Sequence, residues 1–204
     1  MSRFKLLEAS FVAAVVTFAA SYGYADEFSA RLNGFNELGA LNAQTGAVLS
    51  DGTGTASLQL NQRAGTIDYT LSYSKVGTTP PKTGTVSQAH IHFGKSRDSG
   101  GVLVFFCTNL TFSGTGPTPP ACPKNSGTVS GTWTKANVQA IAGQNVVAGD
   151  FDALVDVLTS NTAYANVHTT SGTTPETAFP AGEIRGQIHS EDKEQQKDKE
   201  QQED

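Results

Sequence analysis

Apolar and polar side chains alternate along several short segments of the chain. In residues 66–73, every second side chain from Ile67 to Tyr73 is apolar, and the side chains between them are polar. This period of two is typical of a β-strand with one buried face. Alternating or apolar patterns of this kind predict eight strands, at residues 28–35, 54–60, 66–73, 86–93, 102–107, 128–133, 164–169 and 183–188.

The segments between these strands are rich in turn-forming residues. Gly, Pro, Asn, Asp and Ser gather at residues 50–52, 61–65, 77–84 and 113–120. Short strands with such punctuation favour an all-β sandwich or barrel. Residues 150–158 depart from the pattern, because Phe151, Leu154 and Leu158 recur at helical spacing. We therefore expect one or two short helices, the second capped by Thr134, as covers over an open end of the sheet.

The composition agrees with one β-rich domain. The chain has 204 residues, 37% of them hydrophobic and 16% charged, with 21 glycines. This length is within the range of one domain, and the charged fraction lies below the roughly 25% usual in globular proteins. The net charge is −5. No basic stripe is present, so nucleic acid is not expected as a partner.

Both ends of the chain differ from the middle. Residues 1–25 combine basic Arg3 and Lys5, an apolar run over 11–20, and the small residues Gly23 and Ala25. This pattern is typical of a cleaved secretory signal peptide. The alternative, an uncleaved anchor, is disfavoured because spanning a bilayer takes about 20 apolar residues. We expect a secreted or periplasmic protein that has no membrane span after cleavage.

The remainder divides into a domain over residues 26–189 and a tail over residues 190–204. The tail carries seven acidic and three basic residues and no apolar side chain. Such a segment has no surface to bury against the entropy of ordering, so it is predicted to be disordered and dispensable for folding.

The two cysteines, Cys107 and Cys122, are predicted to form a disulfide, because an oxidising compartment would pair them. The alternative is a pair of free buried thiols. A metal site is a poor interpretation, because no close Cys or His spacing joins them.

The four histidines are the main candidates for chemistry. His90 and His92 are two residues apart on a predicted strand, so both leave the face opposite Ile91. His168 is placed similarly on another strand, and His189 follows the last one. If these strands are neighbours, three or four imidazoles could converge on one copper or zinc ion, since neutral imidazole suits both metals.

A metal-free polar network is the competing interpretation, and the one that the residues alone favour. Asn166, Glu183 and Arg185 lie on the same predicted faces as the histidines. Asn166 or Glu183 could orient the rings, and Glu183 with Arg185 is expected to form an ion pair along one strand. No nucleophile constellation or phosphate loop is found, so no catalytic residue is assigned and enzymatic function is disfavoured.

Three stretches resemble CHRD (chordin-type) domains. The sequence Ala-His-Ile-His-Phe-Gly at 89–94 is similar to one signature of the family, and residues 164–169 with 180–188 are similar to another. Residues 127–133 echo its Gly-x-x-x-Gly-x-Trp segment. The resemblance spans about residues 27–189, and the insert between the two cysteines departs from it.

The resemblance implies an antiparallel β-sandwich or barrel of the immunoglobulin or Cu/Zn superoxide dismutase type. It leaves an extracellular protein ligand open as a partner, because chordin is an extracellular protein that binds signalling ligands. His90 and His92 also resemble the copper-binding strand of the dismutases. Four histidines fill at most one mononuclear site, which argues against bimetallic chemistry.

The favoured hypothesis is an exported CHRD protein with a structural or binding role. The alternatives are a mononuclear copper redox enzyme and an extracellular matrix or adhesion module.

Overall fold

A computed structural model describes residues 26–38, 46–82, 84–170 and 178–191. The predicted signal peptide, and the predicted tail beyond Glu191, lie outside the described residues.

Nine strands are the main secondary structure of the described chain. They are β1 (Asp26–Asn33), β2 (Thr53–Asn61), β3 (Thr66–Ser74), β4 (Thr85–Phe93), β5 (Gly101–Thr108), β6 (Gly127–Trp133), β7 (Ala163–Thr170), β8 (Ile184–Gln187) and β9 (His189–Ser190). All eight predicted strands are present, with bounds shifted by one or two residues. The two-residue strand β9 was not predicted.

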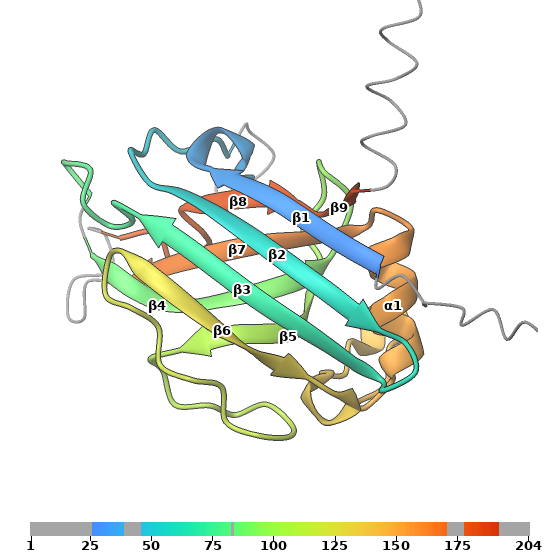
Figure 1. Ribbon diagram of the computed structural model, residues 1–204. Helices are drawn as coiled ribbons and strands as arrows, with labels where there is room; N and C mark the ends of the chain where they lie inside the picture. The colour runs from blue at the N-terminus through green and yellow to red at the C-terminus, as the bar shows by residue number, and fades with distance from the viewer. Residues whose placement is uncertain (1–25, 39–45, 83, 171–177, 192–204) are drawn as a thin grey trace, which may run out of the picture.

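The strands form one antiparallel sheet that curls into a nearly closed barrel. Its order is β5-β4-β7-β8-β1-β2-β3-β6, and β9 pairs with β1. Figure 1 shows β1, β2, β3 and β6 as one layer in front of β8, β7, β4 and β5. Side chains of β6 and of β3 reach β5 at the open seam. The Trp133 indole on β6 donates to the Phe105 carbonyl at 2.8 Å, and the Tyr69 hydroxyl on β3 donates to the Phe106 carbonyl at 3.0 Å. The predicted antiparallel all-β fold is confirmed.

The barrel interior is the hydrophobic core, as the alternation of β2 and β3 requires. The apolar faces of the two strands point inward, so Leu58 on β2 and Leu71 on β3 are buried. The side chains that alternate with the apolar ones along each strand are exposed or half-buried. The core continues through Ile91 on β4 and Val167 on β7.

One α-helix closes an end of the barrel. Helix α1 (Phe151–Thr159) begins after Asp150, whose side chain accepts a hydrogen bond from the Ala153 amide. It buries Leu154 and Leu158 against the core and lies across one end of the strands in Figure 1. A 3₁₀ turn, Lys135–Asn137, carries the predicted cap at Thr134. The predicted helix is therefore present, and the predicted cap at Thr134 begins a turn that ends before Val138.

Two details differ from the sequence predictions. β1 ends at Asn33 instead of residue 35, because the Asn33 side chain caps the 3₁₀ turn Gly34–Asn36. Ser190, assigned to the tail, pairs with Phe28 in β9. No helix in the described ranges is long and apolar enough to cross a membrane.

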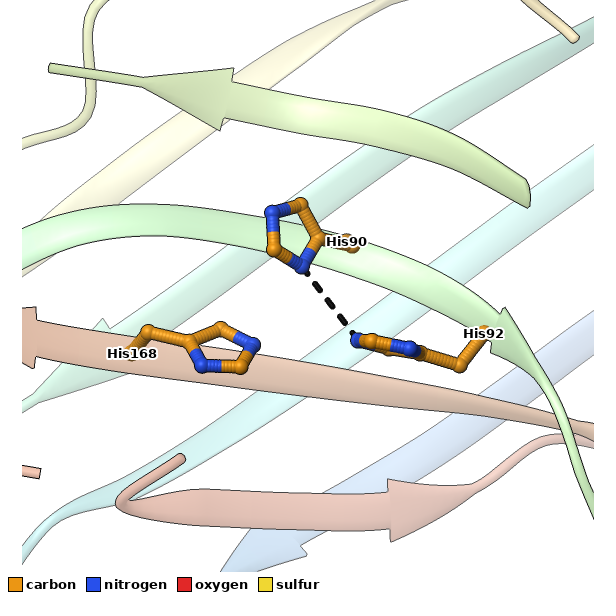
Figure 2. Close-up of side chains that lie close together, drawn as sticks. All are labelled: His90, His92 and His168. Carbon is orange, nitrogen blue, oxygen red and sulfur yellow. Dashed lines mark hydrogen bonds between the residues drawn. The ribbon is translucent and has the colours of Figure 1, made fainter. Parts of the chain in front are cut away.

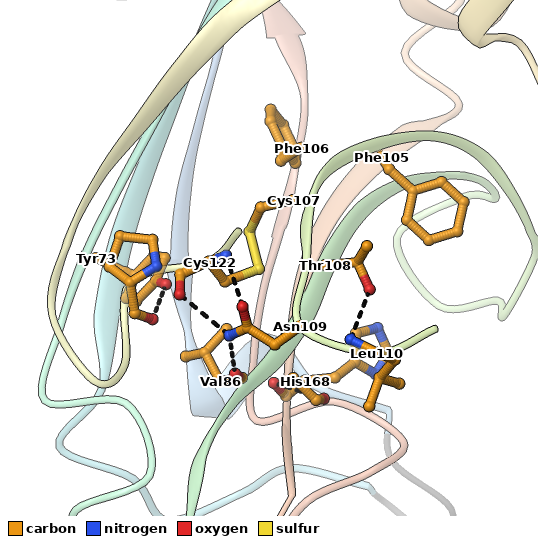
Figure 3. Close-up of a disulfide and its surroundings, with 12 residues drawn as sticks. Tyr73, Val86, Phe105, Phe106, Cys107, Thr108, Asn109, Leu110, Cys122 and His168 are labelled. Carbon is orange, nitrogen blue, oxygen red and sulfur yellow. Dashed lines mark hydrogen bonds between the residues drawn. A yellow bond between two sulfur atoms is a disulfide. The ribbon is translucent and has the colours of Figure 1, made fainter. Parts of the chain in front are cut away.

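The cysteines form the predicted disulfide. Cys107 at the end of β5 is bonded to Cys122, fifteen residues later. Figure 3 shows Asn109 between the two segments. Its side-chain amide donates to the carbonyls of Val86 and Cys122, and its Oδ1 accepts from the Cys122 amide. The loop is thus attached to the barrel by both covalent and hydrogen bonds.

Candidate metal centre

Three of the four histidines lie together on the face of β4 and β7 that points away from the barrel core. One ring nitrogen from each of His90, His92 and His168 can be chosen so that all three atoms are within 4.8 Å of one another. His90 and His92 come from β4 and His168 from the neighbouring β7 (Figure 2). Nδ1 of His90 and Nε2 of His92 are 3.3 Å apart.

Strand pairing explains why the rings meet. His90 lies opposite Asn166 on β7, and Gln88 lies opposite His168, so His90 and His168 are diagonal neighbours on one face. In the pairing of β4 with β5, the register shifts between Ala89 and His90 and again between Ile91 and His92. Bulges of this kind bend a strand and re-aim its side chains, and they often lie next to functional sites.

Backbone carbonyls hold two of the rings in place. Nδ1 of His92 is 2.9 Å from the Gly100 carbonyl oxygen, and Nδ1 of His168 is 3.0 Å from the Pro180 carbonyl oxygen. Because a carbonyl only accepts, each of these Nδ1 atoms carries the proton and each Nε2 is an acceptor. Nε2 of His92 lies 3.3 Å from Nδ1 of His90, and Nε2 of His168 has no hydrogen-bond partner among the described residues. An outer carbonyl that fixes the ring in this way is the usual support for a metal-binding histidine.

Two ring nitrogens in the cluster lack a hydrogen-bond partner among the described residues. They are Nε2 of His90 and Nε2 of His168, and both atoms are buried. Buried polar atoms are normally satisfied, so each exception requires an explanation. A cation shared by the three rings would engage the lone pair of His168 Nε2, which faces the other two rings, whereas the ring nitrogen of His90 nearest to His92 is Nδ1 (Figure 2).

The site is buried and its histidines are neutral. Only 2% of His90, 8% of His92 and 6% of His168 is exposed, so the strand face that points away from the core is itself covered. Burial lowers the pKa of His92 and of His168 to about 4, and lowers that of His90 well below its ordinary value. Neutral imidazole is the form that binds metals.

Aromatic rings and one arginine line the surroundings. Tyr164 stacks in parallel on His92 with ring centroids 4.8 Å apart, and the Arg185 guanidinium lies 3.4 Å from the centre of the Tyr164 ring. Phe105 meets His90 edge to face at 4.6 Å and is itself covered by Phe112. These contacts fix the rings and keep the site apolar.

The remaining predicted site residues have different positions. His189 is not in the cluster: it pairs with Ser29 in β9 and lines a surface cavity. Asn166 lies in the same row as His90 and is buried. Arg185 donates to the carbonyls of Lys95 and Asp98, which form the loop after β4.

Among the described residues, the hydrogen-bond partners of the Glu183 carboxylate include neither Arg185 nor a histidine. Its carboxylate is fully buried and accepts from the Ser50 hydroxyl, the Gly77 amide and the Thr169 hydroxyl. It therefore belongs to a structural polar network that connects three loops to β7.

Sequence reasoning missed the aromatic surroundings. Tyr164 could have been found, because it alternates with Asn166 and His168 on one face of β7. Phe105 could not, because its position beside His90 depends on the shifted register between β4 and β5.

A comparison with protein-family profiles decides the family. The profile of the CHRD domain matches residues 28–188, which is most of the chain. The chain belongs to the CHRD domain family. The match covers every strand from β1 to β8 except the first two residues of β1, so the CHRD domain is the barrel itself, with the three histidines on it. A search of curated proteins gave no match.

Proposed function

We propose that this CHRD domain is exported and binds one copper or zinc ion through His90, His92 and His168. The observation that carries the proposal is the buried Nε2 of His168, which has no hydrogen-bond partner among the described residues while the Nδ1 of the same ring is held by the Pro180 carbonyl. A purely structural polar layer would be expected to satisfy this atom.

The spacing of the rings is close to that of a shared ion. Three nitrogens around one ion at about 2.0–2.1 Å lie about 3.5–3.6 Å apart in a trigonal set. The chosen nitrogens are within 4.8 Å of one another, so the widest pair would have to approach by at most about 1.3 Å. His189 is not part of the proposed set.

Burial supports a binding role over an enzyme. The three histidines are covered by Phe105, Tyr164 and the loop that carries Gly100, which leaves them nearly inaccessible. Catalytic metal sites keep an open coordination position that substrate can reach. Export is supported by the disulfide, since such bonds persist in oxidising compartments.

Equilibrium dialysis of the purified metal-free domain against copper and against zinc tests metal binding. Wild type should retain about one ion per chain, and His92→Ala should retain none, because it removes one of three donors. His189→Ala is the matched control, since it removes a histidine outside the cluster and should leave uptake unchanged.

A metal-free polar layer gives a different result. Wild type would then retain neither metal, and His92→Ala would only lower the melting temperature. Retention by His92→Ala equal to wild type would also contradict the proposal. Near-UV circular dichroism of each variant checks that the barrel is intact.

A further inference from the structure

The charge of the centre points to one oxidation state of one metal. Resting on the proposed metal-binding function, we propose that His90, His92 and His168 select monovalent copper over Cu(II) and Zn(II). Imidazole accommodates both copper and zinc, so the ligand type alone does not decide between them. The decision depends on charge, burial and the number of donors.

The donor set brings no negative charge. Its three members are neutral imidazoles, and among the described residues no Asp, Glu or Cys joins the group. Two acids are buried among the described residues. The Glu183 carboxylate accepts from Ser50, Gly77 and Thr169, and Glu37 acts on Arg185 and Tyr164. A bound ion would therefore keep its full formal charge.

That charge would lie in an apolar environment. Phe105 and Tyr164 pack directly on the histidine rings, and all three histidines are buried. The cost of transferring an ion from water to a low-dielectric interior rises with the square of its charge, so it is about fourfold larger for a divalent than for a monovalent ion. Without a carboxylate to offset it, this difference favours Cu(I).

The charged side chain that acts on His92 is also positive. Arg185 stacks on the Tyr164 ring that covers His92, and its charge helps to lower the pKa of His92, after burial and His168. The negative charges of Glu37 and Asp98 act on Arg185 and raise its pKa, and they partly offset its positive charge. Neither is among the groups that act on the histidines.

The number of donors leads to the same choice. Zinc is almost always four-coordinate in structural sites, and the cluster offers three ligands. Monovalent copper has no ligand-field preference and accepts trigonal coordination by three nitrogens. A buried three-histidine set therefore fits Cu(I) without a further ligand.

Competition for metal by the purified full-length mature protein tests the selectivity. Cu(I) is supplied anaerobically as its bicinchoninate complex, and the loss of the complex's absorbance measures transfer to the protein. Cu(II) and Zn(II) are measured by equilibrium dialysis. We expect Cu(I) to bind at least about 100-fold more tightly than either divalent ion.

A charge variant tests the cause. Asn166→Asp places a carboxylate of the same shape opposite His90, and should shift the preference towards Zn(II) and Cu(II) by tenfold or more. Asn36→Asp makes the same change at an exposed position and should shift nothing. If Asn166→Asp does not fold, the wild-type ranking still decides.

The outcomes separate the two proposals. Divalent ions bound as tightly as Cu(I) would overturn the selectivity while leaving the metal-binding function intact. Retention of no ion would overturn both. A wild-type preference for Cu(I) that Asn166→Asp leaves unchanged would overturn the electrostatic explanation.

Discussion

At the scale of single residues, the three buried histidines hold their protons far more weakly than histidines in water. Burial lowers the pKa of His92 and of His168 to about 4. The hydrogen bonds to Gly100 and Pro180 raise these pKa values, but by less than burial lowers them. Folding therefore requires these groups to stay neutral. The same property that prepares them as ligands makes the metal-free barrel sensitive to acid.

The metal-free protein should lose stability as pH falls from about 6.5 to about 4. In this window the unfolded chain binds protons that the folded chain does not, so the free energy of unfolding decreases with decreasing pH. A shift from 6.5 to about 4 corresponds to an upper limit on the order of 3 kcal/mol per histidine. Urea unfolding of the chelator-treated protein at several pH values measures this dependence.

The matched comparison isolates the histidines from the carboxylates, which also titrate in acid. His168→Gln removes one buried imidazole and should flatten the pH dependence between 6.5 and 4.5. His189→Gln, outside the cluster, should keep the wild-type slope. Equal slopes for wild type and His168→Gln would contradict the buried neutral state.

At the scale of elements, the strands and the histidine pair could be predicted because they depend on local alternation. The period of two sends His90 and His92 to one face and Ile91 to the core, whatever strand lies beside them. What covers that face could not be predicted. It depends on the bulges of β5 and on loops that reach the site from distant parts of the chain.

The positions of two residues, His189 and Glu183, were wrongly predicted from strand alternation, each for its own physical reason. Ile188 still bonds to Ala163, but the next residue, His189, leaves β7 and pairs with Ser29 of β1, so it does not continue the face of Arg185. Glu183 precedes β8 and follows Gly182, whose φ of +128° turns the chain. A Cβ at Gly182 would collide with the Asn166 amide, so this turn is restricted to glycine.

The disulfide should stabilise the loop between Cys107 and Cys122, which helps to cover the site. This loop carries Phe112, which packs on Phe105, and Phe105 packs on His90. Replacing both cysteines with alanine should cost about 3 kcal/mol, because the unfolded chain regains loop entropy. Guanidinium unfolding of the variant and of wild type measures the difference.

Reduction provides the control for this prediction. Wild type in excess dithiothreitol should approach the variant, while the variant itself should not respond to dithiothreitol. Two alkylatable thiols in native exported protein would show that the bond is not formed, and equal stabilities would show that it does not contribute.

At the scale of the whole molecule, the barrel is complete within the described residues, and the last of its strands ends at Ser190. Residues 192–204 carry six acidic and three basic side chains and none that is apolar. A truncation after Glu191 should therefore melt within about 2 °C of the full mature protein by differential scanning calorimetry.

A longer truncation is the contrast. Ending the chain at Gln187 removes β9 and the fully buried Ile188, and should lower the melting temperature by much more. If the shorter truncation were equally damaging, the tail would have to pack against the barrel.

Cleavage after Ala25 would leave β1 intact as the structure describes it. Asp26 is the first described residue, and it pairs with Leu60. We expect protein recovered from the periplasm or medium to begin at Asp26, as measured by intact mass. Ala25→Lys should block processing, because signal peptidase requires small residues at this position. Recovery of mature protein that still contains residues 1–25 would contradict cleavage, and with it the route by which the histidine centre would reach an oxidising compartment.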